Sequence, residues 1–230
     1  MPALRIHANV SCHMMTTILK DDYKTKLGTI RNWVESNLGD AMVQGDHTIK
    51  TLGHLISLQK FELKKEWFVD AMDIESSQGW RWHIEKINDT TETLHIYCKL
   101  INPTKDTSFG GSSGQYLDAI EIENKTEQLH IGTEDGEIMQ SRAEKSDWMP
   151  NRFKEKLSDY YSFTEYIDYG FKTVVPHLTP GEKIYFHFLI ATNTIKPSLE
   201  FQDERDISTW FAVDKHKPFL DKYFESQYGS

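Results

Sequence analysis

Short strand-like segments separated by tight turns fill the middle of this chain, and they limit its fold more than any other sequence feature. Apolar side chains in these segments recur at every second position or form β-branched and aromatic runs, as is typical of strands. The expected strands span residues 80–87, 93–101, 116–123, 127–133 and 137–140. Their connections are short, so they should form an antiparallel meander in which 80–87 pairs directly with 93–101.

Two turn signals and three further segments extend this sheet. Asp135-Gly136 suits a two-residue hairpin turn, and Thr179–Glu182 has Pro and Gly where a type II turn requires them. The second turn leads into 183–192, an unbroken apolar run that suits a central strand. Further strands are expected at 67–72 and 208–213.

Helices are expected where apolar residues recur at spacings of three and four. This pattern covers 18–38 and a shorter stretch at 49–58, and Asp147 can cap a middle helix that extends to Gly170. A last helix should follow Pro218. We therefore expect an α+β fold: an antiparallel β-sheet meander of about eight strands, arranged as a sandwich or partly closed barrel, with N-terminal, middle and C-terminal helices.

The length of 230 residues suits a single α+β domain, which we assign to residues 15–230. Residues 1–14 are interpreted as a non-native or disordered leader, because His13-Met14 is a dipeptide often left at a cloning junction. Two cysteines, Cys12 and Cys98, do not make a disulfide framework, so a cytoplasmic location is expected. The apolar runs are too short to span a membrane, and no membrane association is expected.

The charge balance of the chain bears on its partners. Lys and Arg total 26 against 35 for Asp and Glu, and the formal net charge is −9. This excess opposes attraction to phosphate groups, so nucleic acid is an unlikely partner. The acidity either only keeps the protein soluble or forms a patch that matches a basic protein.

Local motifs for chemistry are weak in this sequence. His95 and Cys98 are three positions apart on a strand and therefore point to opposite faces, so no metal site is expected. The glycine-rich stretch Gly110–Gly114 matches no nucleotide-binding pattern, and residues 102–114 are interpreted as a loop. No nucleophile elbow or zinc-protease motif occurs, and no cofactor is expected. An enzymatic activity is therefore disfavoured, although catalysis by residues far apart in the sequence remains open.

Surplus tyrosines and acidic residues suggest a binding surface instead. Tyr161, Tyr166 and Tyr169 should lie outside the buried stripe of the middle helix, where amphipathic rings suit a partner surface. Strand alternation places Glu121 and Glu123 on one face and Asp118 on the other, so the two glutamates form a solvated acidic face. These five candidate residues, the three tyrosines and two glutamates, predict a non-enzymatic protein-binding protein, such as an inhibitor or immunity-type protein, that engages a basic partner.

The alternative is a small-molecule-binding protein or enzyme with a cavity between the sheet and its helices. Trp82, His187 and Trp210 are the side chains expected to line that cavity. A lone histidine in an apolar strand is more often a hydrogen-bonded core residue, so His187 carries this alternative only weakly.

Overall fold

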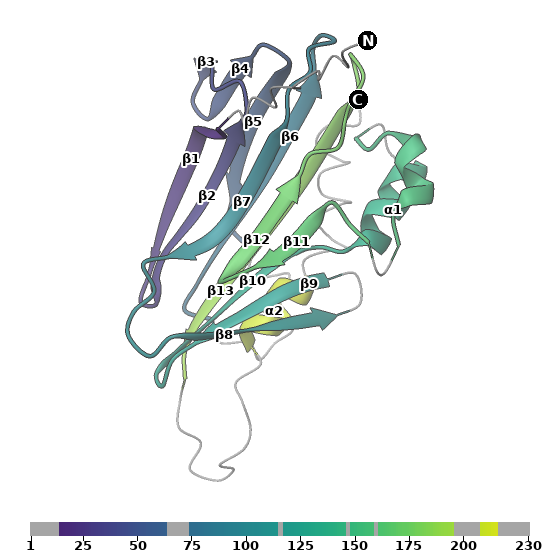
Figure 1. Ribbon diagram of the computed structural model, residues 1–230. Helices are drawn as coiled ribbons and strands as arrows, with labels where there is room; N and C mark the ends of the chain where they lie inside the picture. Colours follow the sequence, from purple (N-terminus) through teal and green to yellow (C-terminus); the bar gives the residue numbers. More distant parts are fainter. Residues whose placement is uncertain are drawn as a thin grey trace, which may run out of the picture.

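The computed structural model describes residues 14–63, 74–114, 117–145, 148–158, 161–195 and 208–215, which form two antiparallel β-sheets and a few short helices (Figure 1). The first sheet has five strands in the order β1 (Thr16–Thr25), β2 (Gly28–Ser36), β7 (Leu94–Ile101), β12 (Gly170–Val174) and β11 (Thr164–Ile167). The second has eight in the order β3 (Ala41–Gly45), β4 (Thr48–Thr51), β5 (His54–Phe61), β6 (Ser76–Lys86), β13 (Lys183–Thr194), β10 (Glu127–Glu134), β9 (Leu117–Glu123) and β8 (Ser108–Gly114). Neither sheet closes on itself, so the described residues do not form a barrel. The helices are few and short, so the described fold is mostly β rather than α+β.

The two sheets face each other across a shared apolar core. Phe171 of β12 and Phe188 of β13 stack across it with ring centroids 6.5 Å apart. The core also contains one polar tie, in which Trp82 Nε1 donates to Asn32 Oδ1 at 2.7 Å and both residues are fully buried. Because a buried polar group is costly without a partner, this hydrogen bond fixes the position of β6 over β2.

Three short helices accompany the sheets: α1 (Gly136–Lys145), η2 (Asn151–Lys156) and α2 (Ser208–Lys215). Helix α1 packs against η2 on one side of the molecule, at the right of Figure 1. Helix α2 covers the outer face of β13, β10 and β9, where Val213 fits against Gly132. The eight-stranded sheet is therefore buried on both faces in its middle, which explains the unbroken apolar run of β13.

The helix expected at 18–38 is wrong, because this segment forms the β1–β2 hairpin. Tyr23 lies opposite Ile30, and the turn between the strands ends at Gly28 with φ of 145°. A Cβ atom at Gly28 would lie 2.8 Å from the carbonyl oxygen of Asn102, so the turn needs glycine for space as well as for its backbone angle. The helix expected at 49–58 is also wrong, since these residues belong to β4 and β5.

The middle helix expected over 147–170 is wrong, because the described residues of this range form η2 and β11 instead. The strand expected at 137–140 lies instead in α1, because Asp135 Oδ1 accepts a hydrogen bond from Ile138 N at 3.0 Å and so caps a helix. The strand expected at 208–213 lies in α2.

The strands expected at 80–87, 93–101, 116–123, 127–133 and 183–192 are confirmed as β6, β7, β9, β10 and β13. The turn at Thr179–Glu182 is also confirmed, with Glu182 N donating to Thr179 O at 2.9 Å, and β13 lies within the sheet as expected. The direct pairing of 80–87 with 93–101 is wrong: β6 pairs with β5 and β13, whereas β7 pairs with β2 and β12. The β6–β7 connection thus crosses from one sheet to the other.

Residues 102–114 are not wholly a loop, because 108–114 form β8. The strand expected at 67–72, the helix after Pro218 and almost all of the leader 1–14 lie outside the described residues.

Candidate functional site

The outermost strands β8 and β11 belong to different sheets, and aromatic side chains join them. We define the aromatic margin as Phe109, Tyr166 and Tyr169. The Tyr169 ring packs on Phe109 with centroids 4.4 Å apart, and its hydroxyl donates to the Thr107 carbonyl oxygen at 3.1 Å. Phe109 and Tyr166 remain 43% and 45% exposed, so the margin presents large rings to solvent.

Tyr166 carries the most polar contacts of this margin. Its hydroxyl lies 2.9 Å from Asp118 Oδ1 and 3.3 Å from the Ser112 carbonyl oxygen, so its single proton can be donated across to either strand β9 or β8. Partial burial, followed by the negative charge of Asp118, raises the pKa of Tyr166, and Asp135 acts in the same direction. The ring is therefore a neutral hydrogen-bond donor beside negative charge.

Tyr161 lies beyond the other end of β11 and is 54% exposed. It borders an open hollow of about 600 Å³ together with Arg152, Lys156 and Phe163. The guanidinium of Arg152 is held by Glu182, which it contacts at 2.6 Å and 2.9 Å, and by the His177 carbonyl oxygen. Tyr161 thus faces basic neighbours, unlike Tyr166.

The structure does not bring the two predicted glutamates next to the tyrosines. Glu121 lies opposite His130 on the outer face of the eight-stranded sheet, where Gln128 Nε2 donates to Glu121 Oε1 at 2.6 Å. Glu123 follows two residues later on that same face. Asp118, to which Tyr166 binds, points to the other face, so the tyrosines and the glutamates flank β8 and β9 from two sides.

The three side chains of the alternative cavity do not share one space. Trp82 lies in the core between the sheets, whereas His187 lies opposite Arg81 on the outer face of the eight-stranded sheet. Trp210 is on α2, where its ring would lie 3.0 Å from a Cβ atom at Gly114. None of these three residues lines the hollow beside Tyr161, the hollow beside the β1–β2 turn or the hollow between α1 and Gly181.

A buried ionic cluster on the outer face of the eight-stranded sheet escaped prediction from the sequence. Glu134 Oε1 accepts from Arg142 Nη2 at 2.5 Å and lies 2.9 Å from His187 Nδ1, while Glu134 Oε2 accepts from His187 N at 3.0 Å. The Arg142 guanidinium lies 3.6 Å from the Tyr185 ring centroid. Burial alone would raise the pKa of Glu134, but Arg142 and His187 lower it to about 2. His187 inside the apolar strand β13 was the sequence signal for this cluster, whereas Glu134 ends β10 and Arg142 lies on α1.

His83 and Arg81 adjoin this cluster on β6. Burial, with the positive charges of Arg81 and Arg142, lowers the pKa of His83 to about 3, so its ring is neutral at pH 7. Arg81 Nη2 donates to Gln59 Oε1 at 2.6 Å. Both guanidinium groups lie near the Tyr185 ring, Arg142 at 3.6 Å and Arg81 at 5.8 Å from its centroid. The ion pair of Arg142 with Glu134 joins α1 to β10 and therefore supports the position of this helix.

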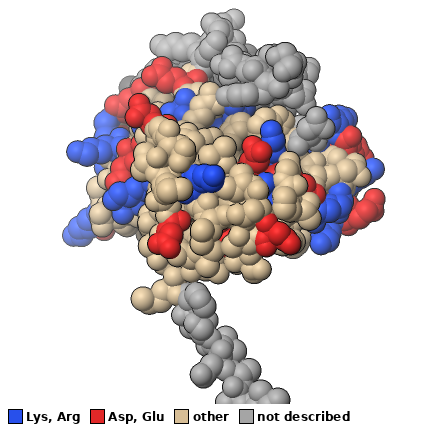
Figure 2. Space-filling model, turned by 90° about the horizontal axis from the view of Figure 1, so that it is seen from above, with Lys and Arg blue, Asp and Glu red and all other residues tan. Residues whose placement is uncertain are grey.

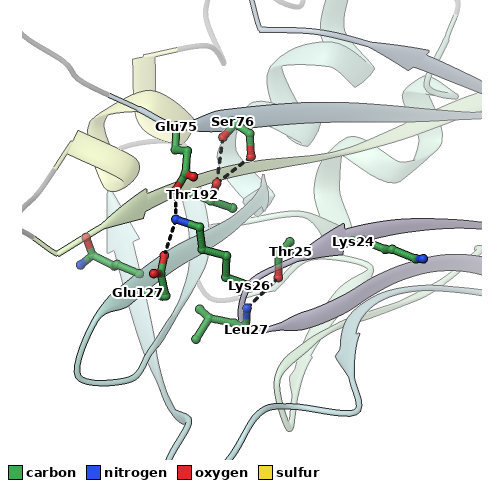
Figure 3. Close-up of a pocket in the computed structure, with 9 residues that line it drawn as sticks. Lys24, Thr25, Lys26, Leu27, Glu75, Ser76, Glu127 and Thr192 are labelled. Atoms are coloured by element: carbon green, nitrogen blue, oxygen red, sulfur yellow. Dashed lines mark hydrogen bonds and ion pairs between the residues drawn. The ribbon is translucent and has the colours of Figure 1, made fainter.

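A smaller hollow of about 420 Å³ lies beside the β1–β2 turn (Figure 3). Lys26 reaches across it, and its Nζ lies 2.7 Å from Glu75 Oε2 and 3.4 Å from Glu127 Oε2. Ser76 and Thr192 hydrogen bond to each other at its rear with oxygen atoms 2.7 Å apart. Lys26, both glutamates, Ser76 and Thr192 thus have hydrogen-bond or ion-pair partners within the hollow. We therefore interpret this hollow as a contact between the two sheets.

Neither metal ligation nor membrane crossing is indicated within the described ranges. No group of three or more His, Cys, Asp or Glu side chains there could hold a metal ion. No helix there is both long and apolar enough to cross a membrane. On the face shown in Figure 2, acidic and basic side chains are interspersed among uncharged residues.

Comparison with known proteins provides no relative from which to transfer a function. No family model, no curated protein and no solved structure matches this chain.

Proposed function

We propose that this chain is a non-enzymatic protein-binding protein, of the inhibitor or immunity type, that engages a basic partner in the cytoplasm through the aromatic margin. The observation that carries this proposal is the exposure of Phe109 on β8 and Tyr166 on β11, two strands that lie at the outer edges of the two sheets. Partly exposed aromatic rings with a polar tip are the side chains most enriched in protein interfaces.

The charge around Tyr166 supports a basic partner. Asp118 accepts from the Tyr166 hydroxyl, and Asp135 also acts on that hydroxyl electrostatically. Glu165 precedes Tyr166, and its side chain is 58% exposed. Lys172 Nζ lies 3.4 Å from Glu165 Oε1. This ion pair offsets the negative charge of Glu165 only in part, because its carboxylate is exposed to solvent. A partner carrying Lys or Arg would gain both charge attraction and cation–π contact here.

Affinity capture from a lysate of the native host, at low and high salt, tests the proposal. The double variant Phe109→Ser/Tyr166→Ser should lose a stoichiometric partner that the unchanged protein retains, and high salt should weaken capture. Met42→Ser/Val43→Ser is the matched control, since Met42 and Val43 are also exposed apolar residues but lie on β3, at the opposite edge of the eight-stranded sheet. Capture that is absent, or equal for both double variants, would refute the proposal.

The alternative function, small-molecule binding or catalysis between sheet and helices, has one favourable observation. His187 contacts Glu134 within the buried ionic cluster, and buried charge clusters with shifted pKa values are frequent at functional sites. A ligand there should raise the melting temperature of the unchanged protein and not that of His187→Gln in a screen of small anions and metabolites.

A further inference from the structure

Strand β8 is an open sheet edge without the usual protection. Among the described strands its backbone pairs with β9 alone, over seven residues from Ser108 to Gly114, and the register shows no bulge. One side chain of the other sheet also contacts it, because the Tyr166 hydroxyl lies 3.3 Å from the Ser112 carbonyl oxygen. The sequence Ser-Phe-Gly-Gly-Ser-Ser-Gly contains no charge and no proline. Exposed edges normally carry lysine, proline or a bulge, because a bare edge pairs with other strands.

The other three outer strands in the described part of the chain are less suited to pairing. Strand β1 carries four charged residues and a register shift between Thr17 and Leu19. Strand β3 has five residues and a shift between Val43 and Gly45, and β11 has only four residues. Strand β8 is thus the longest regular and uncharged edge among them.

The two faces of β8 are open near its middle. A Cβ atom at Gly110 would meet no atom within 4 Å, and one at Gly111 would meet only Tyr166, at 3.8 Å. At the end of the strand, a Cβ atom at Gly114 would lie 2.9 Å from Asp214 and 3.0 Å from Trp210 of α2. The exposed Phe109 ring follows Ser108 on this strand. A strand laid beside β8, about 5 Å away, would therefore meet Phe109 and Tyr166 on one face of the sheet.

The charge beneath β8 indicates what that strand should carry. Each charged residue of β9 directly opposes a small residue of β8: Glu123 lies opposite Ser108, Glu121 opposite Gly110 and Asp118 opposite Ser113. All of these charges are negative. Within the described ranges Glu123 makes no ion pair. Lysine or arginine stems on an added strand could extend over the small side chains of β8 toward these carboxylates.

We propose that β8 accepts an extended, lysine- or arginine-bearing segment of the partner protein, which adds to the eight-stranded sheet as a further strand. This inference rests on the proposed function and specifies its binding mode: backbone hydrogen bonds supply affinity, and alternate side chains meet the acidic face and the aromatic margin.

A labelled eight-residue peptide of alternating lysine and valine serves as the probe, read by fluorescence anisotropy at low salt. Binding should be lost for a glutamate–valine peptide and for a lysine–valine peptide N-methylated at every residue, which keeps its charge but has no backbone donors. Glu121→Gln/Glu123→Gln should raise the Kd about tenfold. Equal binding of the N-methylated peptide would overturn strand addition, as would no binding of the unmodified peptide.

Two neighbouring proline variants, Gly110→Pro and Gly111→Pro, complete the test. Successive N–H groups of a strand point to opposite sides, so one variant removes a donor to β9 and the other removes a donor from the open edge. The variant that keeps the melting temperature of the unchanged protein should bind the peptide at least about tenfold more weakly. Unchanged binding by that variant would refute strand addition.

The same variants separate this inference from the proposed function. If the stable proline variant still captures the host partner while Phe109→Ser/Tyr166→Ser does not, the protein binds through the aromatic margin but not by strand addition. If the unchanged protein forms dimers in light scattering and the stable proline variant does not, β8 pairs with a second copy and the basic-partner inference is wrong.

Discussion

Replacing Glu134 by glutamine removes the one carboxylate of the buried ionic cluster while keeping the side-chain shape. Glu134 is fully buried, and it accepts hydrogen bonds from Arg142 and from the His187 backbone. Breaking such a pair from one side typically costs about 3–5 kcal/mol, because a buried guanidinium loses its counter-charge. Glu134→Gln should therefore lower the free energy of unfolding at pH 7 by an amount in that range.

The pKa of Glu134 adds a signature that depends on pH. Arg142 and His187 hold this pKa at about 2, against an ordinary value of 4.5, so the folded state favours the ionised carboxylate. The ionised Glu134 carboxylate therefore adds to the free energy of unfolding. This contribution is complete above pH 4.5 and disappears as the pH falls through 4.5 toward 2. At about 1.4 kcal/mol for each pKa unit, it amounts to about 3 kcal/mol at neutral pH, of which about 2 kcal/mol is lost by pH 3.

Urea denaturation at pH 7, 5 and 3, followed by tryptophan fluorescence, measures this contribution. The difference in free energy of unfolding between the unchanged protein and Glu134→Gln should narrow by about 2 kcal/mol from pH 7 to pH 3. Taking the difference cancels other acidic groups, including the buried Glu92, whose pKa is also about 2. Glu144→Gln, on the exposed surface, should follow the unchanged protein at every pH. A constant difference between pH 7 and pH 3 would refute the electrostatic account of this cluster.

Three further predictions concern the core. Gly136→Ala should destabilise the protein by about 1–3 kcal/mol in urea denaturation, since its Cβ would collide with the Ser158 carbonyl oxygen; an unchanged midpoint would contradict this packing. Trp82→Phe should lower the free energy of unfolding, measured by thermal unfolding, by about 1–3 kcal/mol, because it leaves the buried Asn32 Oδ1 without its hydrogen-bond donor. A smaller loss would mean that this hydrogen bond does not hold the two sheets together. Burial raises the pKa of the Cys98 thiol, so peptide mapping after iodoacetamide treatment at pH 8 should find Cys98 alkylated only in urea; alkylation of the native protein would show that the core opens.

The alternation of apolar and polar residues predicted the strands whose two faces differ in polarity. It failed where the spacing of apolar residues fits both the helical period of 3.6 and the strand period of two. Ile30 and Val34 are four positions apart, which matches one helical turn as well as two strand repeats. In β2 both are buried beside Asn32, so the period is two. The hydrogen bond from Trp82 to Asn32 and the pairing of β2 with β7 are distant in sequence, and no local pattern could reveal them.

The dipeptide Asp135-Gly136 shows a different ambiguity. Its residues suit a hairpin turn, yet the Asp135 carboxylate can equally accept from a backbone N–H three residues later and begin a helix. Tertiary contact decided between these outcomes: Arg142 reaches Glu134 only when the intervening residues form α1. A pattern read within a few residues does not contain this information.

The candidate site was partly accessible from the sequence. Tyr161 and Tyr166 were expected to lie outside the core, and both are exposed, although the structure places Tyr166 on β11 rather than on a helix. Glycine-rich β8 was interpreted as a loop because its side chains carry no period, and only pairing with β9 makes it a strand. The edge strand β8 therefore depends on a neighbour that sequence patterns do not identify.

The position of β13 between β6 and β10 has a consequence for how the chain folds. Ile84 of β6 lies opposite Ile184 of β13, one hundred positions later, so the middle of the eight-stranded sheet joins segments far apart along the chain. During synthesis the edge of β6 that pairs with β13 stays unpaired until β13 has left the ribosome. Because the central pairing of the sheet is so distant in sequence, slow folding is expected from this strand order.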